Sequence, residues 1–576
     1  MELRLEINNK EVKAHPDETI IEVAQRNKIN IPAFCYHPRL KVVGACRICV
    51  VEVEGSPTLV ASCSTPVKDG MKIYTHSKRV IEARKEIIEL LLADHDLNCP
   101  TCRKNLNCKL QEYSRDFMIE EINYEMEPKS HEKDTSSVSI VRDPNKCIMC
   151  ERCVRVCNSV QTVHAIENAY RGSEITVTPP FNHDLNKSAC VNCGQCVVNC
   201  PTAALVEKSD ITPIVQLLRK KLEKQSNKHI VVQTAPSIRA TLGECFGMEP
   251  GTFVTGRMVT ALKKIGFDKV FDTDLCADMT IVEEATEFIK RFKKSKDLPL
   301  ITTCCPAWIK FGEQFFFEEL KHMSTCRSPQ AMMGRLVKRF YSKEMGIDPK
   351  DIILVDIMPC TAKKFEIARP EFKDEVDYVL TTQELGNLLK IFNINFPELT
   401  DSKFDSPLGE ASGAGAIFGR TGGVMEAALR TAADMLSNKQ LKRLDYHHVR
   451  GMETLKEAEI KIQGTSIKVA VVQTLGEARK IMEQIQKGTC PYHFIEIMAC
   501  YGGCIGGGGQ PPLNNEIDVL EKRALALNNY DKSTRLRKSH KNPTLIKIYN
   551  KYFGKFGGKN AHKHLHTDYV KRDFIG

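Results

Sequence analysis

The sequence predicts a multidomain chain that combines α+β and α/β architecture. Its 576 residues are too many for a single hydrophobic core, so we expect several domains. Residues 1–76 alternate between apolar and polar positions, which is typical of a small β-rich domain. From about residue 210, apolar runs of strand length alternate with helical stretches, which is typical of an α/β domain.

The N-terminal elements follow from pattern and capping. "LRLEI" and "EVKAH" flank "NNK" as a hairpin, "TIIEVAQRN" is a short helix, and "RICVVEVEG" and "TLVASC" form a second strand pair. Residues 77–93 predict a helix capped by Ser77, with an apolar face made by Val80, Ile87, Ile88, Leu91 and Leu92. The polar stretch 127–139 predicts a linker or a surface crossing.

Five apolar runs are the strand candidates of the C-terminal region: "HIVVQTA", "PLITT", "DIILVDIM", "IKVAVVQ" and "FIEIM". The cysteines that recur in this region sit at or just beyond the ends of these runs. The carboxyl ends of strands are where α/β folds usually place their chemistry, so we expect a site there.

The chain contains 24 cysteines, most of them in short ordered runs. The N-terminal "MELRLEINNKEV" lacks the basic and then apolar pattern of a secretory signal, and no apolar run reaches the roughly 18 residues of a membrane span. We therefore expect a cytoplasmic protein without membrane contact, whose cysteines bind metals rather than form disulfides.

Positive charge is concentrated at the C-terminal end. The formal net charge is +10, and residues 521–576 contain 14 Lys or Arg but only 4 Asp or Glu. A solvated basic surface is the simple interpretation, and a docking face for an acidic protein is the alternative. Nucleic acid is disfavoured, because the sequence has no finger, recognition-helix or RNA-binding signature.

Four cysteines of the β-rich domain have the spacing C-x10-C-x2-C-x13-C: Cys35, Cys46, Cys49 and Cys63. This departs from the shorter plant-ferredoxin spacing. A CxxC pair on a loop with a distant fourth cysteine nevertheless suits a 2Fe–2S centre. A structural zinc site is the alternative.

A second set has the spacing H-x3-C-x2-C-x5-C: His95, Cys99, Cys102 and Cys108. A histidine alone would be an ordinary surface or core residue, but three cysteines directly after it favour a cluster ligand. An imidazole in place of a thiolate removes a negative charge, which should raise the potential of a 4Fe–4S cluster.

Two near-identical runs follow, Cys147, Cys150, Cys153 and Cys157, and then Cys190, Cys193, Cys196 and Cys200 before Pro201. This C-x2-C-x2-C-x3-C repeat is the pattern of two-cluster bacterial ferredoxins, in which each fourth cysteine ligates the other cluster. We therefore expect Cys200 to complete the first 4Fe–4S site and Cys157 the second. The four centres together form a chain that carries single electrons.

Three further segments stand out: "TTCCPAW" (302–308), "MPCTAKKFE" (358–366) and "EIMACYGGCIGGGGQP" (496–511). Together they closely resemble the three signature segments of the iron–iron (FeFe) hydrogenases. The accessory motifs resemble those of the monomeric clostridial-type enzymes, so the resemblance extends over essentially the whole chain.

The resemblance implies four domains: a β-grasp 2Fe–2S ferredoxin-like domain (1–78), a His/Cys3 4Fe–4S domain (79–126), a two-cluster 4Fe–4S ferredoxin-like domain (127–209) and a two-lobed α/β catalytic domain (210–576). It implies a ferredoxin hydrogenase that reversibly reduces protons to dihydrogen, with ferredoxin or flavodoxin as electron partner. It also implies a monomer whose two-iron subcluster is built by maturation proteins.

The resemblance also implies the active centre, the H-cluster, a 4Fe–4S cubane joined through a cysteine sulfur to two irons that carry CO, cyanide and an azadithiolate. By motif position the cubane ligands are Cys305, Cys360, Cys500 and Cys504, and Cys504 is the bridge. Lys363 matches the lysine that hydrogen-bonds a cyanide. The other expected contacts are Pro236, Ser237, Ser328, Gln330 and an apolar wall of Met358, Met498 and Phe418.

Adjacent side chains diverge, so Cys304 should face away from the cubane ligand Cys305 and toward the two irons. In the family this cysteine passes protons, and the resemblance assigns the onward route to Glu284, Ser324, Glu287 and Arg291. The two glutamates are three apart, on one side of a predicted helix. Without the resemblance, they would be interpreted as an exposed acidic face.

One position departs from the common family pattern, namely Thr303, where serine is frequent. Cys245, Cys276, Cys326 and Cys490 have no assigned role and are expected to behave as small apolar residues. Three rival interpretations are an electron-transfer subunit of a respiratory complex, a related iron–sulfur assembly protein and a redox or hydrogen sensor. The first does not need "TTCCPAW" or Lys363, the intact cysteine sets and relay argue against the second, and the third should add a signalling domain.

Overall fold

The computed structural model describes residues 2–126, 130–437, 444–462, 465–513 and 518–574. These residues form two compact units. The small unit contains residues 1–160, 164–188 and 199–206, and the large unit contains residues 161–163, 189–198 and 207–576. Among the described residues, no helix is both long and apolar enough to cross a membrane.

The small unit begins with a five-stranded sheet in the order β2-β1-β5-β3-β4. Its strands are β1 (Leu3–Ile7), β2 (Lys10–Ala14), β3 (Val50–Val53), β4 (Val60–Ala61) and β5 (Lys72–Tyr74). The predicted hairpin and second strand pair are confirmed as β1–β2 and β3–β4. The predicted short helix is α1 (Ile20–Arg26), which starts in a capping box between Thr19 and Glu22.

The predicted helix at 77–93 is confirmed as α2 (Lys78–Ala93), with the Ser77 hydroxyl accepting the Val80 N–H. Val80, Ile88 and Leu92 are buried, as predicted, whereas Ile87 and Leu91 are only partly covered. The surprise on this face is Arg84. Its buried guanidinium donates to the carbonyls of Ile48, Val50 and Thr75, so it ties the helix to the sheet.

The predicted surface crossing at 127–139 is confirmed for residues 130–133, which are exposed, but is wrong for Asp134, while residues 127–129 lie outside the described part. Asp134 is buried and exchanges backbone hydrogen bonds of 2.9 and 3.0 Å with Arg142. Its carboxylate accepts the Leu185 N–H at 2.8 Å. A polar residue can be buried when all of its hydrogen bonds are made, which the sequence pattern does not reveal.

The rest of the small unit consists of short elements. They are α3 (Lys109–Asp116), α4 (Arg152–Arg155), β6 (Ile140–Arg142), β7 (Glu167–Ala169), β8 (Thr176–Thr178) and β9 (Leu205–Glu207). β6 pairs with β9 and β7 pairs with β8. Cysteine loops connect these elements, so the backbone here is organised around thiols rather than around a large sheet.

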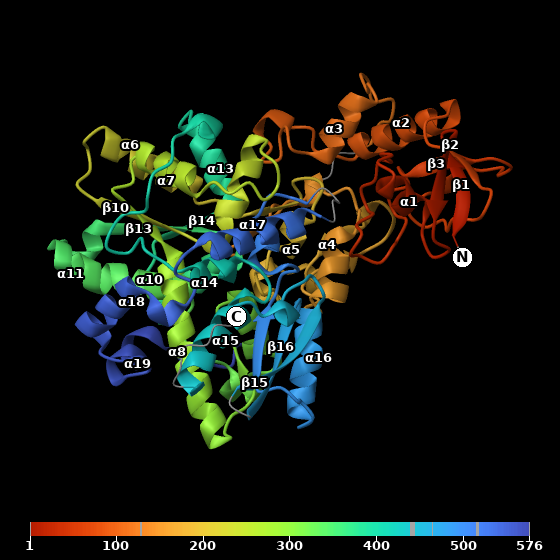
Figure 1. Ribbon diagram of the computed structural model, residues 1–576. Helices are drawn as coiled ribbons and strands as arrows, with labels where there is room; N and C mark the ends of the chain where they lie inside the picture. Colours follow the sequence, from red (N-terminus) through yellow and green to blue (C-terminus); the bar gives the residue numbers. More distant parts are fainter. Residues whose placement is uncertain (1, 127–129, 438–443, 463–464, 514–517, 575–576) are drawn as a thin grey trace. The chain divides into compact units, whose positions relative to one another are not determined.

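Two four-stranded sheets organise the described part of the large unit, and Figure 1 shows them as separate layers. The first has the order β11-β10-β13-β14 and is parallel throughout. The second has the order β12-β17-β16-β15, with only β15 antiparallel. The strands are β10 (His229–Thr234), β11 (Lys269–Asp272), β12 (Leu300–Ile301), β13 (Ile352–Met358), β14 (Tyr378–Thr381), β15 (Leu455–Ile462), β16 (Thr465–Gln473) and β17 (Phe494–Met498).

All five strands expected in this region are confirmed, and β11, β14 and β15 were not predicted. The α-helices of the large unit are α5 (Gln195–Val198), α6 (Ile211–Leu222), α7 (Thr255–Lys264), α8 (Thr273–Lys294), α9 (Pro306–Phe315), α10 (Pro329–Leu336), α11 (Ser342–Met345), α12 (Ala362–Ile367), α13 (Thr382–Ile391), α14 (Gly413–Ala416), α15 (Gly423–Ser437), α16 (Leu475–Gln486), α17 (Val519–Ser533), α18 (Pro543–Ile548) and α19 (Lys559–Leu565).

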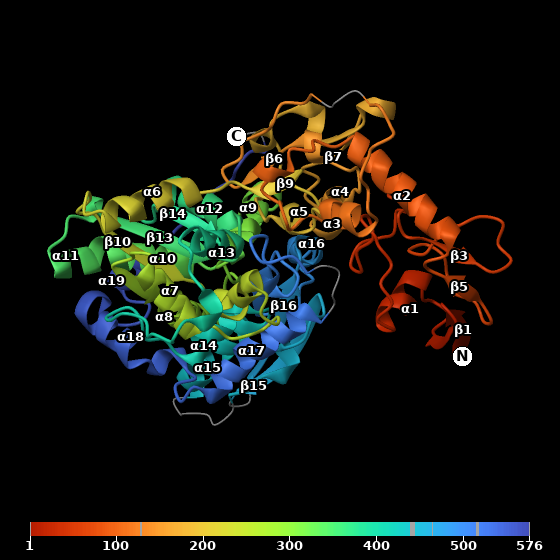
Figure 2. The same ribbon diagram turned by 90° about the horizontal axis from the view of Figure 1, so that it is seen from above.

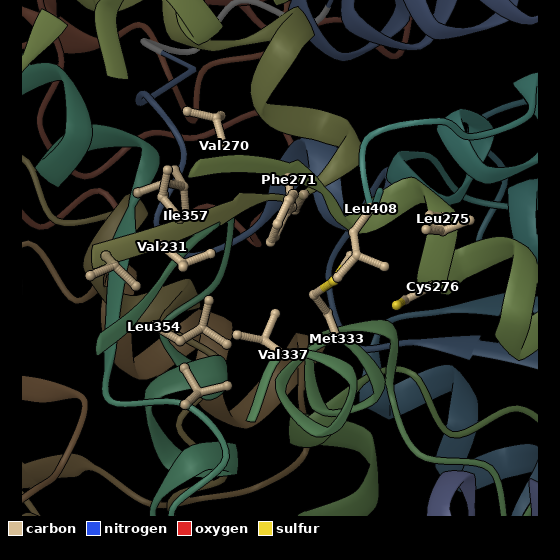
Figure 3. Close-up of a cluster of buried hydrophobic side chains, with 14 of the residues drawn as sticks. Val231, Val270, Phe271, Leu275, Cys276, Met333, Val337, Leu354, Ile357 and Leu408 are labelled. Atoms are coloured by element: carbon tan, nitrogen blue, oxygen red, sulfur yellow. The ribbon is translucent and has the colours of Figure 1, made fainter. Parts of the chain in front are cut away.

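The core of the first sheet is formed by fully buried aliphatic and aromatic side chains. Figure 3 shows Phe271, Leu354 and Met333 converging there, with the Cys276 thiol among them. Cys276 and Cys326 both belong to this cluster and are 0% exposed. They therefore occupy core positions, as expected for small apolar residues.

The basic C-terminal segment is more than a solvated surface. Arg523 is buried and pairs with Glu244, and Arg537 pairs with Asp531 at 2.7 Å. α19 packs against α10, and Figure 2 shows it next to α18 at one side of the large unit. Several of these cations are therefore counter-ions of acids in the fold, which only the tertiary contacts show.

Candidate active site and cluster-binding sites

Four cysteines meet where strands of both large-unit sheets end. Cys305 lies just beyond β12 and precedes α9, Cys360 follows β13, Cys500 follows β17, and Cys504 lies in the turn after it. Burial, and then repulsion from the other thiolates, raises the pKa of Cys500 and Cys504, and it raises that of Cys360 to about 12. Four such thiolates need a neutralising cation, which fits the ligand set of an iron–sulfur cubane.

The backbone around these thiols is too close-packed for side chains. Gly503 has φ of +78°, and a Cβ there would lie 2.6 Å from the Thr421 nitrogen. A Cβ at Gly508 would lie 2.5 Å from the carbonyl oxygen of Cys193. Gly503 therefore requires glycine for both conformation and space, and Gly508 requires it for space.

The loop that carries Cys190, Cys193 and Cys196 is part of the large unit and packs against the same segments. The Thr361 hydroxyl donates to the Asn192 carbonyl at 2.7 Å, and the Gln195 amide donates to the Gly506 carbonyl at 3.0 Å. This contact brings the second ferredoxin-like cysteine run next to the four-cysteine site. Its expected fourth ligand, Cys157, belongs to the small unit.

Lys363, Ser328 and Gln330 are held together by Glu366, a residue that the sequence interpretation missed. Glu366 accepts from the Lys363 ammonium at 2.8 Å and from Ser328 and Gln330 at 2.9 Å each. Burial opposes the Lys363 charge, but Glu366 outweighs it and raises the pKa of the ammonium. The signal was available, because Glu366 lies three residues after Lys363 in "MPCTAKKFE", one helical turn away.

A second missed residue, Gln510, connects Ser237 with the cysteine turn. Its amide donates to the Ser237 hydroxyl at 3.3 Å and to the Cys504 carbonyl at 3.0 Å. Ser237 is fully buried in the short helix that starts at Pro236. The expected apolar residues are also buried: Met358 ends β13, Met498 ends β17, and Phe418 lies between α14 and α15.

The two neighbouring cysteines have different surroundings. Burial and then Glu284 raise the pKa of Cys304 well above its usual value, so this thiol stays protonated. The charge of Cys305 contributes to the pKa shifts of Cys360 and Cys504, and those of Cys504 and Cys305 contribute less than Glu284 to the shift of Cys304. The Lys363 ammonium donates to the Cys304 carbonyl at 3.3 Å.

The expected proton route runs along α8. Glu284 is 0% exposed, so its interpretation as part of an exposed acidic face is excluded. Burial, and then Glu287, raises its pKa to about 8. Its carboxylate oxygens make no hydrogen bond among the described residues, yet the Ser324 hydroxyl and the Thr303 N–H are close enough to stabilise its anion.

Glu287 continues the line toward the surface. Its Oε2 accepts from the Ser324 hydroxyl at 3.3 Å, and its Oε1 accepts from Arg291 at 2.6 Å. Arg291 is fixed by the carbonyls of Lys321 and Met323. The structure therefore brings all five expected relay residues into one continuous region. At position 303, where this chain has threonine and serine is frequent in the family, the Thr303 hydroxyl donates to the Cys326 carbonyl at 2.9 Å.

Three of the expected ligand sets lie wholly in the small unit: the Cys35 set, the set of Cys147, Cys150, Cys153 and Cys200, and the His95 set. Cys35, Cys46, Cys49 and Cys63 are all buried, and side-chain contacts link Cys35 to Cys46 and Cys63, and Cys49 to Cys63. In the second set, burial raises the pKa of Cys150, and the charges of Cys200 and Cys147 add to the shift, so these three thiols lie near one another.

His95, Cys99, Cys102 and Cys108 line a common cavity of about 210 Å³. Leu92, Leu97 and Leu110 provide its apolar wall, and Lys104 lies at its edge. Three cysteines and an imidazole around one space of this size suit a cluster of several irons better than one small ion.

Comparison with known proteins assigns these segments to families. Residues 228–508 match the iron only hydrogenase large subunit, C-terminal domain, and residues 517–572 match the iron hydrogenase small subunit. Residues 1–78 match a 2Fe-2S iron-sulfur cluster binding domain. Residues 84–123 match the NADH-ubiquinone oxidoreductase-G iron-sulfur binding region, and 183–206 match a 4Fe-4S binding domain.

Two relatives cover the whole chain. The NADP-reducing hydrogenase subunit HndD of Solidesulfovibrio fructosivorans is 44% identical over 99% of both chains. Iron hydrogenase 1 of Clostridium pasteurianum is 40% identical over 98% of this chain and 99% of its own. The structure of an apo FeFe hydrogenase from Chlamydomonas reinhardtii is 37% identical, with a TM-score of 0.57 over 64% of this chain and all of the other. The chain therefore belongs to the iron-only (FeFe) hydrogenases.

Proposed function

We propose that this hydrogenase interconverts protons and dihydrogen, 2 H⁺ + 2 e⁻ ⇌ H₂, with single electrons delivered by reduced ferredoxin or flavodoxin. The observation that carries the proposal is the line of polar groups from Cys304 through Glu284, Ser324 and Glu287 to Arg291. It starts beside the four-cysteine site and ends near the surface. Burying polar groups costs free energy, and apolar side chains would fill the same space more stably. We therefore take this buried line to serve function rather than stability.

The residues present fit the H-cluster. Cys305, Cys360, Cys500 and Cys504 would hold its cubane, and the side-chain oxygen Oε1 of Gln330 is buried without a hydrogen-bond partner, while the amide nitrogen of the same side chain donates to the Lys363 carbonyl. When bound, this group would supply the iron at which dihydrogen is formed or cleaved and a 4Fe–4S cubane whose irons store single electrons. The pocket expected around the two irons is completed by Ser237, Ser328, Pro236 and the three apolar residues already described.

Cys304 would hold and release the proton nearest the reacting site. Its raised pKa keeps the thiol protonated, so it can give up its proton only as it receives another. Glu284 is the next carrier, and its pKa of about 8 leaves both protonation states populated near neutrality. The Ser324 hydroxyl, 3.3 Å from Glu287, then connects the two carboxyl groups.

Lys363 would bind an anionic ligand of the two-iron unit. An ammonium has three N–H donors. Glu366 and the Cys304 carbonyl take two of them, at 2.8 and 3.3 Å, which leaves one for a cyanide. Because Glu366 holds the lysine charged, the donor persists in a buried site.

We propose the accessory centres as the electron path: one 2Fe–2S centre at Cys35, Cys46, Cys49 and Cys63, and 4Fe–4S centres at the His95 set and at the two ferredoxin-like sets. We propose that the chain has four domains, with the ranges 1–78, 79–126, 127–209 and 210–576. We also propose a cytoplasmic monomer that depends on maturation proteins. Placement of the Cys190 run against Thr361 supports electron delivery at this point.

Iron content and infrared spectra test the proposal. One 2Fe–2S centre, three 4Fe–4S centres and a six-iron H-cluster total about 20 irons per chain. Protein made without maturation factors should lack the CO and cyanide bands and two of those irons. Full turnover by such protein, with no synthetic cofactor added, would contradict the assignment.

A second candidate is a subunit that exchanges electrons with a pyridine-nucleotide partner. The match to HndD, a subunit of an NADP-reducing hydrogenase, over nearly the entire chain favours it. The two candidates differ in a simple assay. Purified chain alone should evolve dihydrogen from reduced ferredoxin in the first case, whereas the second requires a co-purifying subunit before NADPH supports turnover.

A further inference from the structure

Three ligand-type side chains that no cluster uses converge between α8 and the C-terminal segment of the large unit. The carboxylate of Glu287, the thiol of Cys326 and the imidazole of His566 place their ligand atoms within 4.8 Å of one another. The Cys326 sulfur is 4.0 Å from Glu287 Oε2 and 4.0 Å from His566 Nδ1. Carboxylate, thiolate and imidazole are the three side-chain ligands that zinc takes.

Backbone pairing holds two of these residues opposite each other. Cys326 and His566 form an antiparallel bridge, in which Arg327 N–H donates to Leu565 at 2.9 Å and Thr567 N–H donates to Thr325 at 2.8 Å. Cys326 is 0% and His566 8% exposed. The pair is therefore rigid and largely shielded from water, although 241 residues separate Thr325 from His566.

The His566 imidazole is oriented by a carboxylate that contacts its far ring nitrogen, Nε2. Glu283 Oε2 lies 3.0 Å from His566 Nε2, and Glu283 is itself held by the Tyr549 hydroxyl and the Gly557 N–H. Since an ionised carboxylate only accepts, Nε2 carries the proton, and the Nδ1 lone pair accepts from the Thr325 hydroxyl at 2.7 Å with the Cys326 sulfur 4.0 Å away. A carboxylate on the far nitrogen is the usual support of a metal-bound histidine.

Glu287 is oriented in the same way by Arg291. The guanidinium takes Oε1 at 2.6 Å, which leaves Oε2 directed at Cys326, Ser324 and Thr325. A tetrahedral zinc ion would set the sulfur and imidazole nitrogen about 3.6 Å apart, given Zn–S of about 2.3 Å and Zn–N of about 2.05 Å. The observed 4.0 Å needs only a small movement of the side chains.

We propose that Glu287, Cys326 and His566 bind a zinc-class divalent cation, and that the bound ion stops the proton relay by occupying Glu287 Oε2. The blocking step rests on the proposed function, because it needs Glu287 to carry protons. A metal ion would replace the hydrogen bond that the Thr325 hydroxyl now donates to His566 Nδ1 at 2.7 Å, and the freed Thr325 oxygen or a water would complete the coordination. The ion displaces the thiol proton, and its charge compensates for the buried thiolate.

An exposed histidine lies next to the proposed site, where a metal ion would enter from solvent. The His562 ring stacks on His566 with centroids 4.5 Å apart, and His562 lies one turn earlier on α19 at the surface. It offers an outer ligand to an arriving ion. His564, on the same helix, faces Phe340 and Phe553 instead and provides a matched control.

The test uses the matured holoenzyme with zinc sulfate. Crystals soaked in zinc should show an anomalous peak at the zinc edge between the three side chains, and turnover in solution should fall as zinc is added. The CO and cyanide bands and the iron content must stay unchanged, so that damage to clusters is excluded as the cause.

Two variants make the test specific. Glu283→Gln keeps all three ligands and should raise the zinc concentration for half-inhibition by about 10–100-fold, the usual cost of losing an outer partner. His566→Ala should abolish the peak, and His564→Ala should bind zinc like the wild type. Absence of the peak at saturating zinc, or unchanged inhibition in His566→Ala, overturns the site. Zinc bound there without loss of turnover overturns the blocking step and the relay through Glu287.

Discussion

Replacing Glu284 with glutamine separates two effects of this carboxyl group: its role in proton transfer and the free energy of unfolding that is lost by burying it. Glutamine has the same shape but holds no transferable proton. Glu284 is fully buried, and its pKa is raised from 4.5 to about 8, first by burial and then by Glu287. The folded protein therefore retains this proton at pH values where the unfolded chain has lost it.

The sign and size of the effect follow from this shift. Between pH 4.5 and about 8 the folded state binds more protons than the unfolded state, so the contribution of Glu284 to stability falls as the pH rises. The shift of about 3.5 units corresponds to about 5 kcal/mol at about 1.36 kcal/mol per unit. Glu284→Gln should thus match the wild type in stability near pH 4.5 and exceed it increasingly up to about pH 8.

Turnover should change in the opposite direction. Loss of a proton carrier should lower dihydrogen evolution by about 10²–10⁴-fold. The assay combines turnover, the apparent Tm at a fixed scan rate between pH 5 and 8, and infrared difference spectra of the protonated carboxyl C=O band. Glu384→Gln is the matched control, because Glu384 is equally buried but is held by the Lys364 ammonium and the Thr381 N–H, and the charges that shift its pKa are those of Lys364 and Glu207 rather than of the relay residues.

Either of two results would refute the reasoning. A wild-type carboxyl band that titrates near pH 4.5 would show that Glu284 is not desolvated as the structure indicates. Near-normal turnover in Glu284→Gln, with the H-cluster infrared bands intact, would remove Glu284 from the relay even if the stability effect were found.

Three further predictions concern the site and the electron path. Cys305→Ser should impair assembly of the cluster. Cys304→Ser should keep the CO and cyanide bands but lose at least about 10²-fold in turnover, and Cys304→Asp should retain more activity than Cys304→Ser. Normal activity in Cys304→Ser would leave the paired cysteines unexplained. Glu366→Gln should leave the buried Lys363 charge unpaired, destabilise the protein by about 3–5 kcal/mol and shift the cyanide bands, and unshifted bands would argue against the Lys363 contact. His95→Ala should remove one accessory cluster from the electron paramagnetic resonance spectrum and slow ferredoxin-linked turnover, while loss of the H-cluster bands instead would show that His95 is misassigned.

The cysteine spacings alone predict the accessory ligand sets, because those ligands recur at short intervals along the chain, whereas the set Cys305, Cys360, Cys500 and Cys504 followed only from the family resemblance. Cys35, Cys46 and Cys49 precede β3 and Cys63 follows β4, and the run from His95 to Cys108 lies between α2 and α3. The structure brings the thiols of the first set into contact and places the second set around one cavity. The helix at 77–93 and the five strands were predictable for the same reason, since caps and apolar periodicity are local. β11, β14 and β15 escaped prediction, because they are short or, in β15, alternate at the edge of a sheet.

Tertiary structure decided everything that depends on distant residues sharing a buried space. The sequence contained no sign that Glu284 is fully buried while Glu287 is tied to Arg291, or that Asp134 is internal. The contact between Cys326 and His566, which are 240 positions apart, likewise could not be predicted from the sequence. A carboxyl or thiol acquires its pKa, partners and metal affinity from the groups packed around it, and the chain brings those groups together only by folding.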